Sequence, residues 1–243
     1  MTLSKKALRA IQDYNEVLNA GKQEGYIDTV KKHQEYGDRK DYQFVWAGPW
    51  WTEDRFQPQY DIQPTNAYMM FYQNPHITDL VDLLKKRKVI LDTSKCTNLQ
   101  YFVGGSSITR IGVVDARQVY AFYYPFNGAT KLVEIEKFIL KSNGGQTFSG
   151  CFDNCESLEK MIVEGVIGKA GFNVRWSTKL NKASITSIFN ALSSTTTGLS
   201  VTVSKTAVNN AFGINVDDET TYPEGSEYYI LRHSKDNWTI NYM

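Results

Sequence analysis

The chain has 243 residues, of which 42% are hydrophobic and 22% are charged, and its formal net charge is +1. These proportions are ordinary for a globular protein, and so small a net charge gives no long-range field that would attract nucleic acid. The sequence has no run of about 18 or more apolar residues, so we expect no transmembrane helix and no membrane insertion. The first residues are polar and charged. We therefore expect no signal peptide and synthesis in the cytoplasm.

Residues 1–36 are predicted to be a helical segment for attachment or oligomerisation. Apolar and small residues recur at alternating spacings of 4 and 3, which is the pattern of a heptad seam. The seam consists of Leu3, Ala7, Ala10, Tyr14 and Val17. Two interpretations remain open: the helix joins copies in a coiled coil, or it docks onto its own domain.

Residues 37–91 are predicted to be a cap rich in aromatic residues and proline. Four of the six prolines lie between positions 49 and 75, so long regular elements are not expected there. The aromatic rings must then pack either on the first turn of the following region or on a partner subunit. Trp50 and Trp51 are also candidates for a carbohydrate platform. The segment ends with a helix capped by Thr78 or Asp79, followed by a strand that begins at Val89–Leu91.

Residues 92–192 carry a repeated spacing: phenylalanine, a small residue, leucine or isoleucine, and another apolar residue, each three positions after the last. The copies are Phe102, Gly105, Ile108, Ile111; Phe126, Ala129, Leu132, Ile135; Phe152, Cys155, Leu158, Met161; and a weaker Val174, Ser177, Leu180, Ala183. The third positions fall 24, 26 and 22 residues apart, a period typical of leucine-rich repeats. We therefore predict an α+β fold built as a short, irregular leucine-rich-repeat solenoid of about three or four turns, with strands over residues 108–114, 132–140 and 158–167.

Residues 193–243 are predicted to form a mixed α/β C-terminal cap. The region before it ends in a helix, because Ile185, Ile188, Phe189 and Leu192 follow the helical period. The cap should then contain a strand over Leu199–Val203, a helix capped by Ser204 and running to about Phe212, and a polar loop over 213–227. The alternation of apolar and polar residues over 237–242 predicts a final edge strand.

No catalytic or cofactor site is predicted. Cys96 and Cys155 fit positions for small buried residues, and the spacing between Cys151 and Cys155 lacks the further ligands that a metal site needs. The three histidines, His33, His76 and His233, are isolated from any nucleophile motif. We therefore expect no metal, no cofactor and no enzymatic activity.

Several longer stretches stand out: FQPQYDI at 56–62, NAYMMF at 66–71, ITRIGVVD at 108–115, ASITSI at 183–188, NAL at 190–192 and NWTI at 237–240. These stretches resemble proteins encoded by phages and prophages of gut bacteria, and the repeat, best preserved at Phe152, Cys155 and Leu158, resembles the BspA-like class of leucine-rich repeats. The resemblance implies a virion-associated structural or adhesion protein of the tail or baseplate. The implied partners are other virion or tail proteins, copies of the same chain (a trimer is one option), and a protein or glycan on the host surface.

The predicted binding surface is the aromatic run around Tyr120, Tyr123 and Tyr124, whose rings can stack on sugars or on peptide. The alternative, left open, is that these rings fill the interior. The function expected from the resemblance is host recognition by a protein located in the virion. The alternative function is that of an adhesin on the bacterial surface or in the secreted fraction, which would need an export signal and an anchor.

Overall fold

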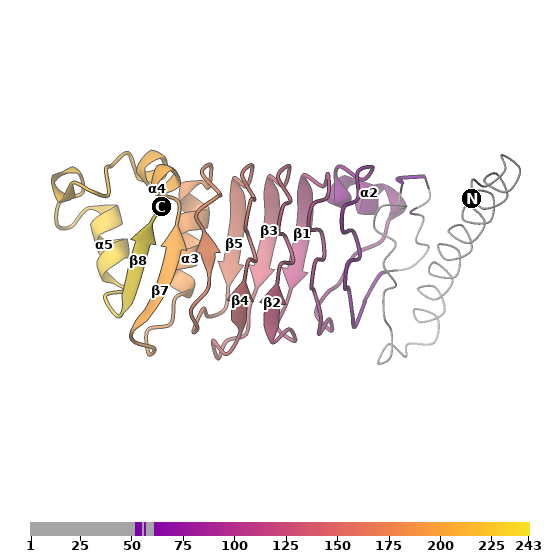
Figure 1. The fold of residues 1–243 in the computed structure, drawn as a ribbon, viewed down its shortest axis with the longest axis horizontal. Helices are drawn as coiled ribbons and strands as arrows, with labels where there is room; N and C mark the ends of the chain where they lie inside the picture. Colours follow the sequence, from indigo (N-terminus) through magenta and orange to yellow (C-terminus); the bar gives the residue numbers. More distant parts are fainter. Residues whose placement is uncertain (1–51, 55, 57–60) are drawn as a thin grey trace, which may run out of the picture.

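The computed structural model describes residues 52–54, 56 and 61–243. Figure 1 shows short strands that lie side by side along the long axis of the molecule, with helices at both ends of the row. In chain order the elements are α2 (Leu80–Arg87), β1 (Arg110–Asp115), β2 (Ala121–Tyr123), β3 (Glu134–Ile139), β4 (Thr147–Ser149), β5 (Lys160–Glu164), β6 (Asn173–Val174), α3 (Lys182–Ala191), β7 (Leu199–Val203), α4 (Lys205–Phe212), the 3-10 helix η2 (Glu219–Thr221), α5 (Glu227–His233) and β8 (Trp238–Tyr242).

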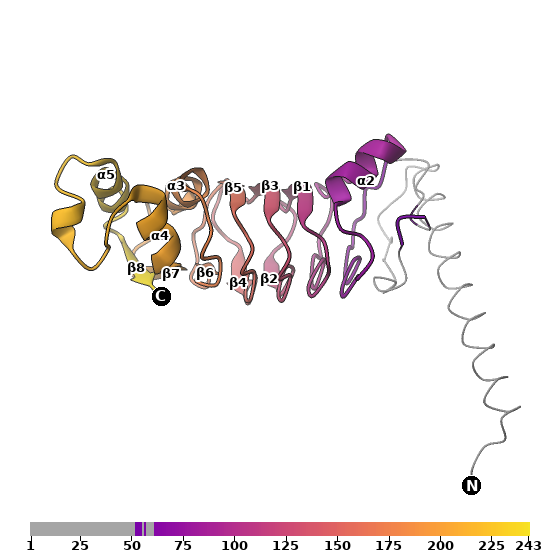
Figure 2. The same cartoon turned by 90° about the horizontal axis from the view of Figure 1, so that it is seen from above.

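The described strands form three small sheets, and every pairing within them is parallel. The strand orders are β1-β3-β5, β2-β4 and β6-β7-β8. Figure 2 shows the β1-β3-β5 sheet along one side of the molecule and the β2-β4 pair along the opposite side. Side chains that point inward from both sides fill the space between them, because successive residues of a strand face opposite ways.

The predicted fold class, an α+β fold built as a leucine-rich-repeat solenoid of three or four turns, is corrected by this arrangement. An α+β fold segregates its helices from an antiparallel sheet. Here all the described sheets are parallel, they are separate and small, and four α-helices accompany them, so the described chain has a mixed α/β architecture. The predicted N-terminal helix of that fold, residues 1–36, lies outside the described residues. The predicted domain boundaries after residues 91 and 192 stay predictions.

The repeated spacing in the sequence corresponds to strand register. Ile111 pairs with Ile135, and Ile135 pairs with Met161, and all three side chains are buried. The first copy of the repeat is shifted by one residue relative to the second copy in the segment that starts at its phenylalanine. The shift follows from the hydrogen bonds, because Val103 N donates to Pro125 O while Phe126 N donates to Cys151 O. This bonding sets Val103, rather than the predicted Phe102, beside Phe126 in the parallel ladder.

Stacked phenylalanines hold the interior together. The rings of Phe126 and Phe152 stack at 5.3 Å, and those of Phe122 and Phe148 stack at 5.1 Å. The ring of Phe138 meets Phe122, Phe126 and Phe152 edge-on, with centroids between 5.3 and 5.8 Å away. Such offset-stacked and edge-on contacts add about 0.5–1.5 kcal/mol per pair to the stabilisation from burial.

The helix α3 seals one edge of the β1-β3-β5 sheet. Asn181 caps its N-terminus by accepting from Ser184 N, as Asn, Ser, Thr and Asp commonly do. Two serine hydroxyls then take the place of a further strand: Ser184 Oγ accepts from Met161 N at 2.9 Å, and Ser187 Oγ accepts from Val163 N at 3.0 Å. These bonds satisfy donors that an open edge would leave free.

Three predicted elements of the C-terminal region are confirmed, and the structure adds one helix that was not predicted. The strand over Leu199–Val203, the helix capped by Ser204 and the final edge strand β8 are all present. The helix α5 was not predicted. Ser226 caps this helix, and its buried residues Tyr228 and Leu231 stand three positions apart on one face, but so short a signal follows a long polar stretch.

The predicted strand at Val89–Leu91 is wrong. Among the described residues, a single bridge forms there, between Leu91 and Ile62. Ile62 N donates to Ile90 O and Asp92 N donates to Ile62 O. A longer ladder would next need a donor from residue 64, which is Pro64 and has no backbone N–H.

Candidate functional site

The structure separates the predicted binding tyrosines by exposure. The side chain of Tyr120 is 76% exposed and that of Tyr123 is 50% exposed, whereas Tyr124 is partly buried. Their neighbours Val119 and Phe122 fill the interior instead. The other predicted site residues, Trp50, Trp51, Leu3, Ala7, Ala10, Tyr14 and Val17, lie outside the described residues.

Two further tyrosines join this surface, and sequence reasoning missed them. The ring of Tyr101 stacks on Tyr124 at 5.5 Å with an interplanar angle of 11°, and Tyr72 lies 5.3 Å from Tyr101 on the other side. We call the five residues Tyr72, Tyr101, Tyr120, Tyr123 and Tyr124 the tyrosine ridge. In the sequence, Tyr101 stands one residue before Phe102 whereas Tyr124 stands two residues before Phe126, so the repeated spacing gives no signal that the two tyrosines occupy the same position.

Hydrogen bonds between neighbouring parallel segments of backbone place these rings in a row. Tyr101 N donates to Tyr123 O, and Tyr124 N donates to Ser149 O of the segment that follows. Tyr101, Tyr124 and Gly150 occupy one recurring position, with φ of 54°, 55° and 56°. A Cβ on Gly150 would stand 2.3 Å from Cε1 of Tyr124, so the absence of a side chain at 150 makes room for this ring. The row of stacked rings therefore ends at Gly150.

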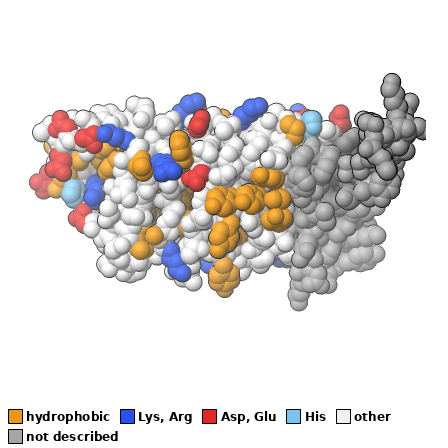
Figure 3. All heavy atoms as spheres, in the orientation of Figure 1, with side chains coloured by type: hydrophobic (Ala, Val, Ile, Leu, Met, Phe, Trp, Pro, Cys, Tyr) orange, Lys and Arg blue, Asp and Glu red, His pale blue; other side chains and the backbone are white. Residues whose placement is uncertain are grey.

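The tyrosine ridge offers both apolar area and hydrogen-bonding groups to solvent. Figure 3 shows hydrophobic side chains gathered near the middle of this face, next to the grey residues. The outward neighbours of Tyr123 are small or hydroxylated: Tyr123 pairs with Ser149, and Ala121 pairs with Thr147. Lys141 Nζ lies 3.4 Å from the centroid of the Tyr120 ring, a cation–π contact that adds a positive charge beside the ridge.

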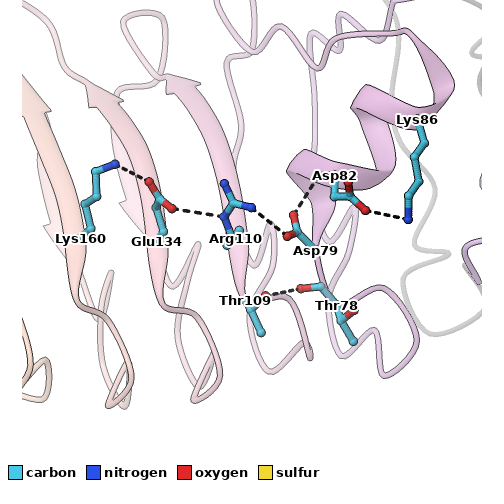
Figure 4. Close-up of polar contacts among 8 residues, drawn as sticks. All are labelled: Thr78, Asp79, Asp82, Lys86, Thr109, Arg110, Glu134 and Lys160. Atoms are coloured by element: carbon cyan, nitrogen blue, oxygen red, sulfur yellow. Dashed lines mark hydrogen bonds and ion pairs between the residues drawn. The ribbon is translucent and has the colours of Figure 1, made fainter.

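A row of charged residues crosses the other sheet, and its groups are engaged with one another (Figure 4). Arg110 Nη1 lies 3.1 Å from Asp79 Oδ2, Arg110 Nε lies 3.2 Å from Glu134 Oε2, and Lys160 Nζ lies 2.5 Å from Glu134 Oε1. The hydrogen bond from Lys160, joined by Arg110, lowers the pKa of Glu134. This row links the N-terminal cap of α2 to the three strands β1, β3 and β5. Because its charges pair with one another, we assign the row a structural role.

The cysteines are buried, and their thiols are held in the protonated form. Burial raises the pKa of Cys96 to about 11 and that of Cys155 to about 12. A nucleophilic cysteine needs the opposite shift. Cys155 Sγ instead contacts Phe126 O at 3.1 Å, which confirms its prediction as a small buried residue.

Neither metal-binding groups nor a histidine site emerge within the described residues. No group of three or more His, Cys, Asp or Glu side chains is arranged there to hold a metal ion. His233 Nδ1 lies 3.2 Å from Asp236 Oδ1, and its ring packs on Tyr229, while His76 is exposed. His33 lies outside the described chain. That the protein is not an enzyme stays a prediction.

No protein-family model matches this chain, and neither a curated protein nor a solved structure matches it. The resemblance to phage-encoded proteins and to BspA-like repeats therefore stays a prediction. Among the helices that the structure describes, none is long and apolar enough to cross a membrane.

Proposed function

We propose that the protein is a non-enzymatic recognition protein of a phage particle, associated with the tail or baseplate, and that the tyrosine ridge contacts the host surface. The observation that carries this proposal is the exposure of Tyr120 and Tyr123 beside the stacked Tyr72, Tyr101 and Tyr124. Tyrosine is favoured at recognition surfaces because its ring is large and stiff while its hydroxyl forms hydrogen bonds.

Weak individual sites give strong attachment when copies act together. We propose that residues 1–36 gather copies of the chain, so that several tyrosine ridges engage one cell surface at the same time. Linking sites in this way raises avidity by about 100-fold to 10,000-fold over a single site without any new contact. The ligand in this proposal is a protein or glycan of the host envelope.

The test begins with the particle. Phage particles purified by density gradient are probed with an antibody against this chain, and the labelled full-length protein is incubated with cells of the infected bacterium. We expect the chain to co-purify with particles and to bind host cells saturably. Absence from particles combined with saturable cell binding would favour the alternative, a bacterial adhesin. Absence from both would overturn the proposed function.

A further inference from the structure

A groove of about 550 Å³ lies between α2 and β1, and it is unrelated to the tyrosine ridge. Figure 2 shows α2 and β1 on the side of the molecule opposite β2, which carries Tyr123. Apolar side chains from both elements line the groove, including Leu84 of α2 and Val113 of β1. At its rim the side chain of Ile90 is 57% exposed and that of Val113 is 40% exposed. Two branched apolar side chains thus remain uncovered in one place.

The floor of the groove includes the edge of a sheet. β1 is the terminal strand of the β1-β3-β5 sheet. At the start of β1, its outer side is held by the bridge between Asp79 and Arg110 and by the bond from Thr109 N to Thr78 O, and at its end Thr93 Oγ1 donates to Asp115 O at 3.0 Å. Beyond Arg110 the groove opens beside Gly112 and Val113. The opposite edge differs, because the serines of α3 cover it.

The charges around the groove select for a basic occupant. Three carboxylates, Asp92, Asp115 and Glu136, line it beside one amine, Lys85. Asp115 is paired with Arg117, whose Nη2 lies 2.5 Å from Asp115 Oδ2. Neither Asp92 nor Glu136 forms an ion pair with another residue that the structure describes. Asp92 and Glu136 together outweigh the one amine of Lys85, so the groove presents an excess of negative charge next to an apolar surface and a strand edge.

We infer that this groove binds an extended peptide segment of a partner protein, which adds as a short strand to the edge of β1 between Arg110 and Asp115. Strand addition takes its affinity from backbone hydrogen bonds and its specificity from alternate side chains. Here one set of alternate side chains is apolar and covers Ile90 and Val113. The other set carries a lysine or arginine that faces Asp92 and Glu136. This site works independently of the proposed host recognition.

A substitution at Gly112 can block the groove. A Cβ built on Gly112 meets its nearest neighbour, Glu136 Oε2, only at 3.9 Å, and its φ lies outside the left-handed region. A larger side chain there projects into open space without strain. Gly112→Leu should therefore leave the fold intact and obstruct the strand edge, while Glu136→Lys reverses one charge without filling the groove.

The experiment uses the full-length protein and a fluorescein-labelled six-residue peptide in which valine alternates with lysine, followed by fluorescence anisotropy. We expect saturable binding that Gly112→Leu and Glu136→Lys each weaken at least tenfold. A peptide with glutamate in place of lysine should also bind at least tenfold more weakly. The control Ile230→Ser, at an exposed apolar residue on α5, and the ridge variant Tyr120→Ser/Tyr123→Ser should bind as the wild type does.

Three results would overturn the inference. Equal binding by the wild type and both groove variants places the peptide elsewhere, and equal binding of the lysine and glutamate peptides removes the charge argument. Light scattering provides the third: a wild-type oligomer that Gly112→Leu dissociates would identify a second copy as the occupant. None of these results bears on host recognition, because that function is read from the ridge variant on cells.

Discussion

At the scale of single residues, Tyr101 and Tyr124 hold a left-handed backbone with φ near 55°. Met69 takes the same position with φ of 54°, and Gly150 fills it in the next parallel segment. A left-handed backbone costs a residue with a side chain about 1–2 kcal/mol. The stacking of the two rings offsets only a similar amount, about 0.5–1.5 kcal/mol. Stability alone thus gives no preference for tyrosine here, which supports a role for these rings at the surface.

Gln146 shows the opposite case, a polar residue that serves the fold. Its side chain is fully buried, Nε2 donates to Ala116 O at 2.8 Å and to Val119 O at 2.6 Å, and Oε1 accepts from Lys141 N at 2.6 Å. Gln146 therefore joins the segments that follow β1 and β3, at the point where both strands have ended.

We predict that Gln146→Leu lowers the free energy of unfolding by about 3 kcal/mol, because it leaves buried backbone groups without partners. Urea denaturation followed by circular dichroism measures the change. Gln118→Leu, at an exposed glutamine in the same region, should change stability by no more than about 0.5 kcal/mol. Similar losses in both variants would show that the hydrogen bonds of Gln146 contribute little.

At the scale of elements, strand edges decide the architecture. Ser184 and Ser187 cover the edge of β5 with hydroxyl groups, and on the other side α2 leaves the edge of β1 partly open. The sequence predicts α3 well, because its apolar residues follow the helical period. It gives no sign of what the two serines do, because their role depends on a strand that lies more than 20 residues away in the chain.

The same reasoning explains which other features could be predicted. The five residues Leu199–Val203 already show the alternation of a strand, and this strand was predicted. β2 and β4 have three residues each, too few for a periodic signal, so the second parallel pair was missed. Three of the five residues of the tyrosine ridge were predicted from the aromatic run that contains them. Tyr72 and Tyr101 could not be predicted, because their place depends on how neighbouring parallel segments align, and the one-residue offset at Val103 hides that alignment in the sequence.

The charged row provides a test of how the elements are joined. Lys160 and Arg110 lower the pKa of Glu134 in the folded protein from its ordinary value of 4.5. Its ion pairs therefore stabilise the fold above about pH 4.5, and that contribution is lost as the pH falls toward the lower folded-state pKa.

We predict that the free energy of unfolding depends less steeply on pH below 4.5 in Glu134→Gln than in the wild type. Thermal or urea unfolding between pH 3 and 6 gives the two curves (about pH 3 covers most of the titration of carboxylates). Glu156→Gln, which removes an exposed carboxylate four residues before Lys160, is the control and should keep the wild-type slope. The same slope in all three proteins would contradict the role assigned to Glu134.

At the scale of the whole molecule, one hydrophobic core runs from Phe56 to Ile240 and carries surface features on opposite sides. The tyrosine ridge lies with β2, and the groove lies between α2 and β1 across the interior (Figure 2). A ligand on one side leaves the other side free. This layout suits a protein that holds a partner with one face and a cell surface with the other.

The central claim is that the tyrosine ridge recognises the host, and binding of the labelled full-length protein to host cells tests it most directly. Tyr120→Ser/Tyr123→Ser removes the two most exposed rings without touching the core. We predict that its apparent affinity for cells falls at least tenfold, which corresponds to about 1.4 kcal/mol or more. Ile230→Ser should bind as the wild type does. Wild-type affinity in the tyrosine variant, with an unchanged fold, would contradict the account.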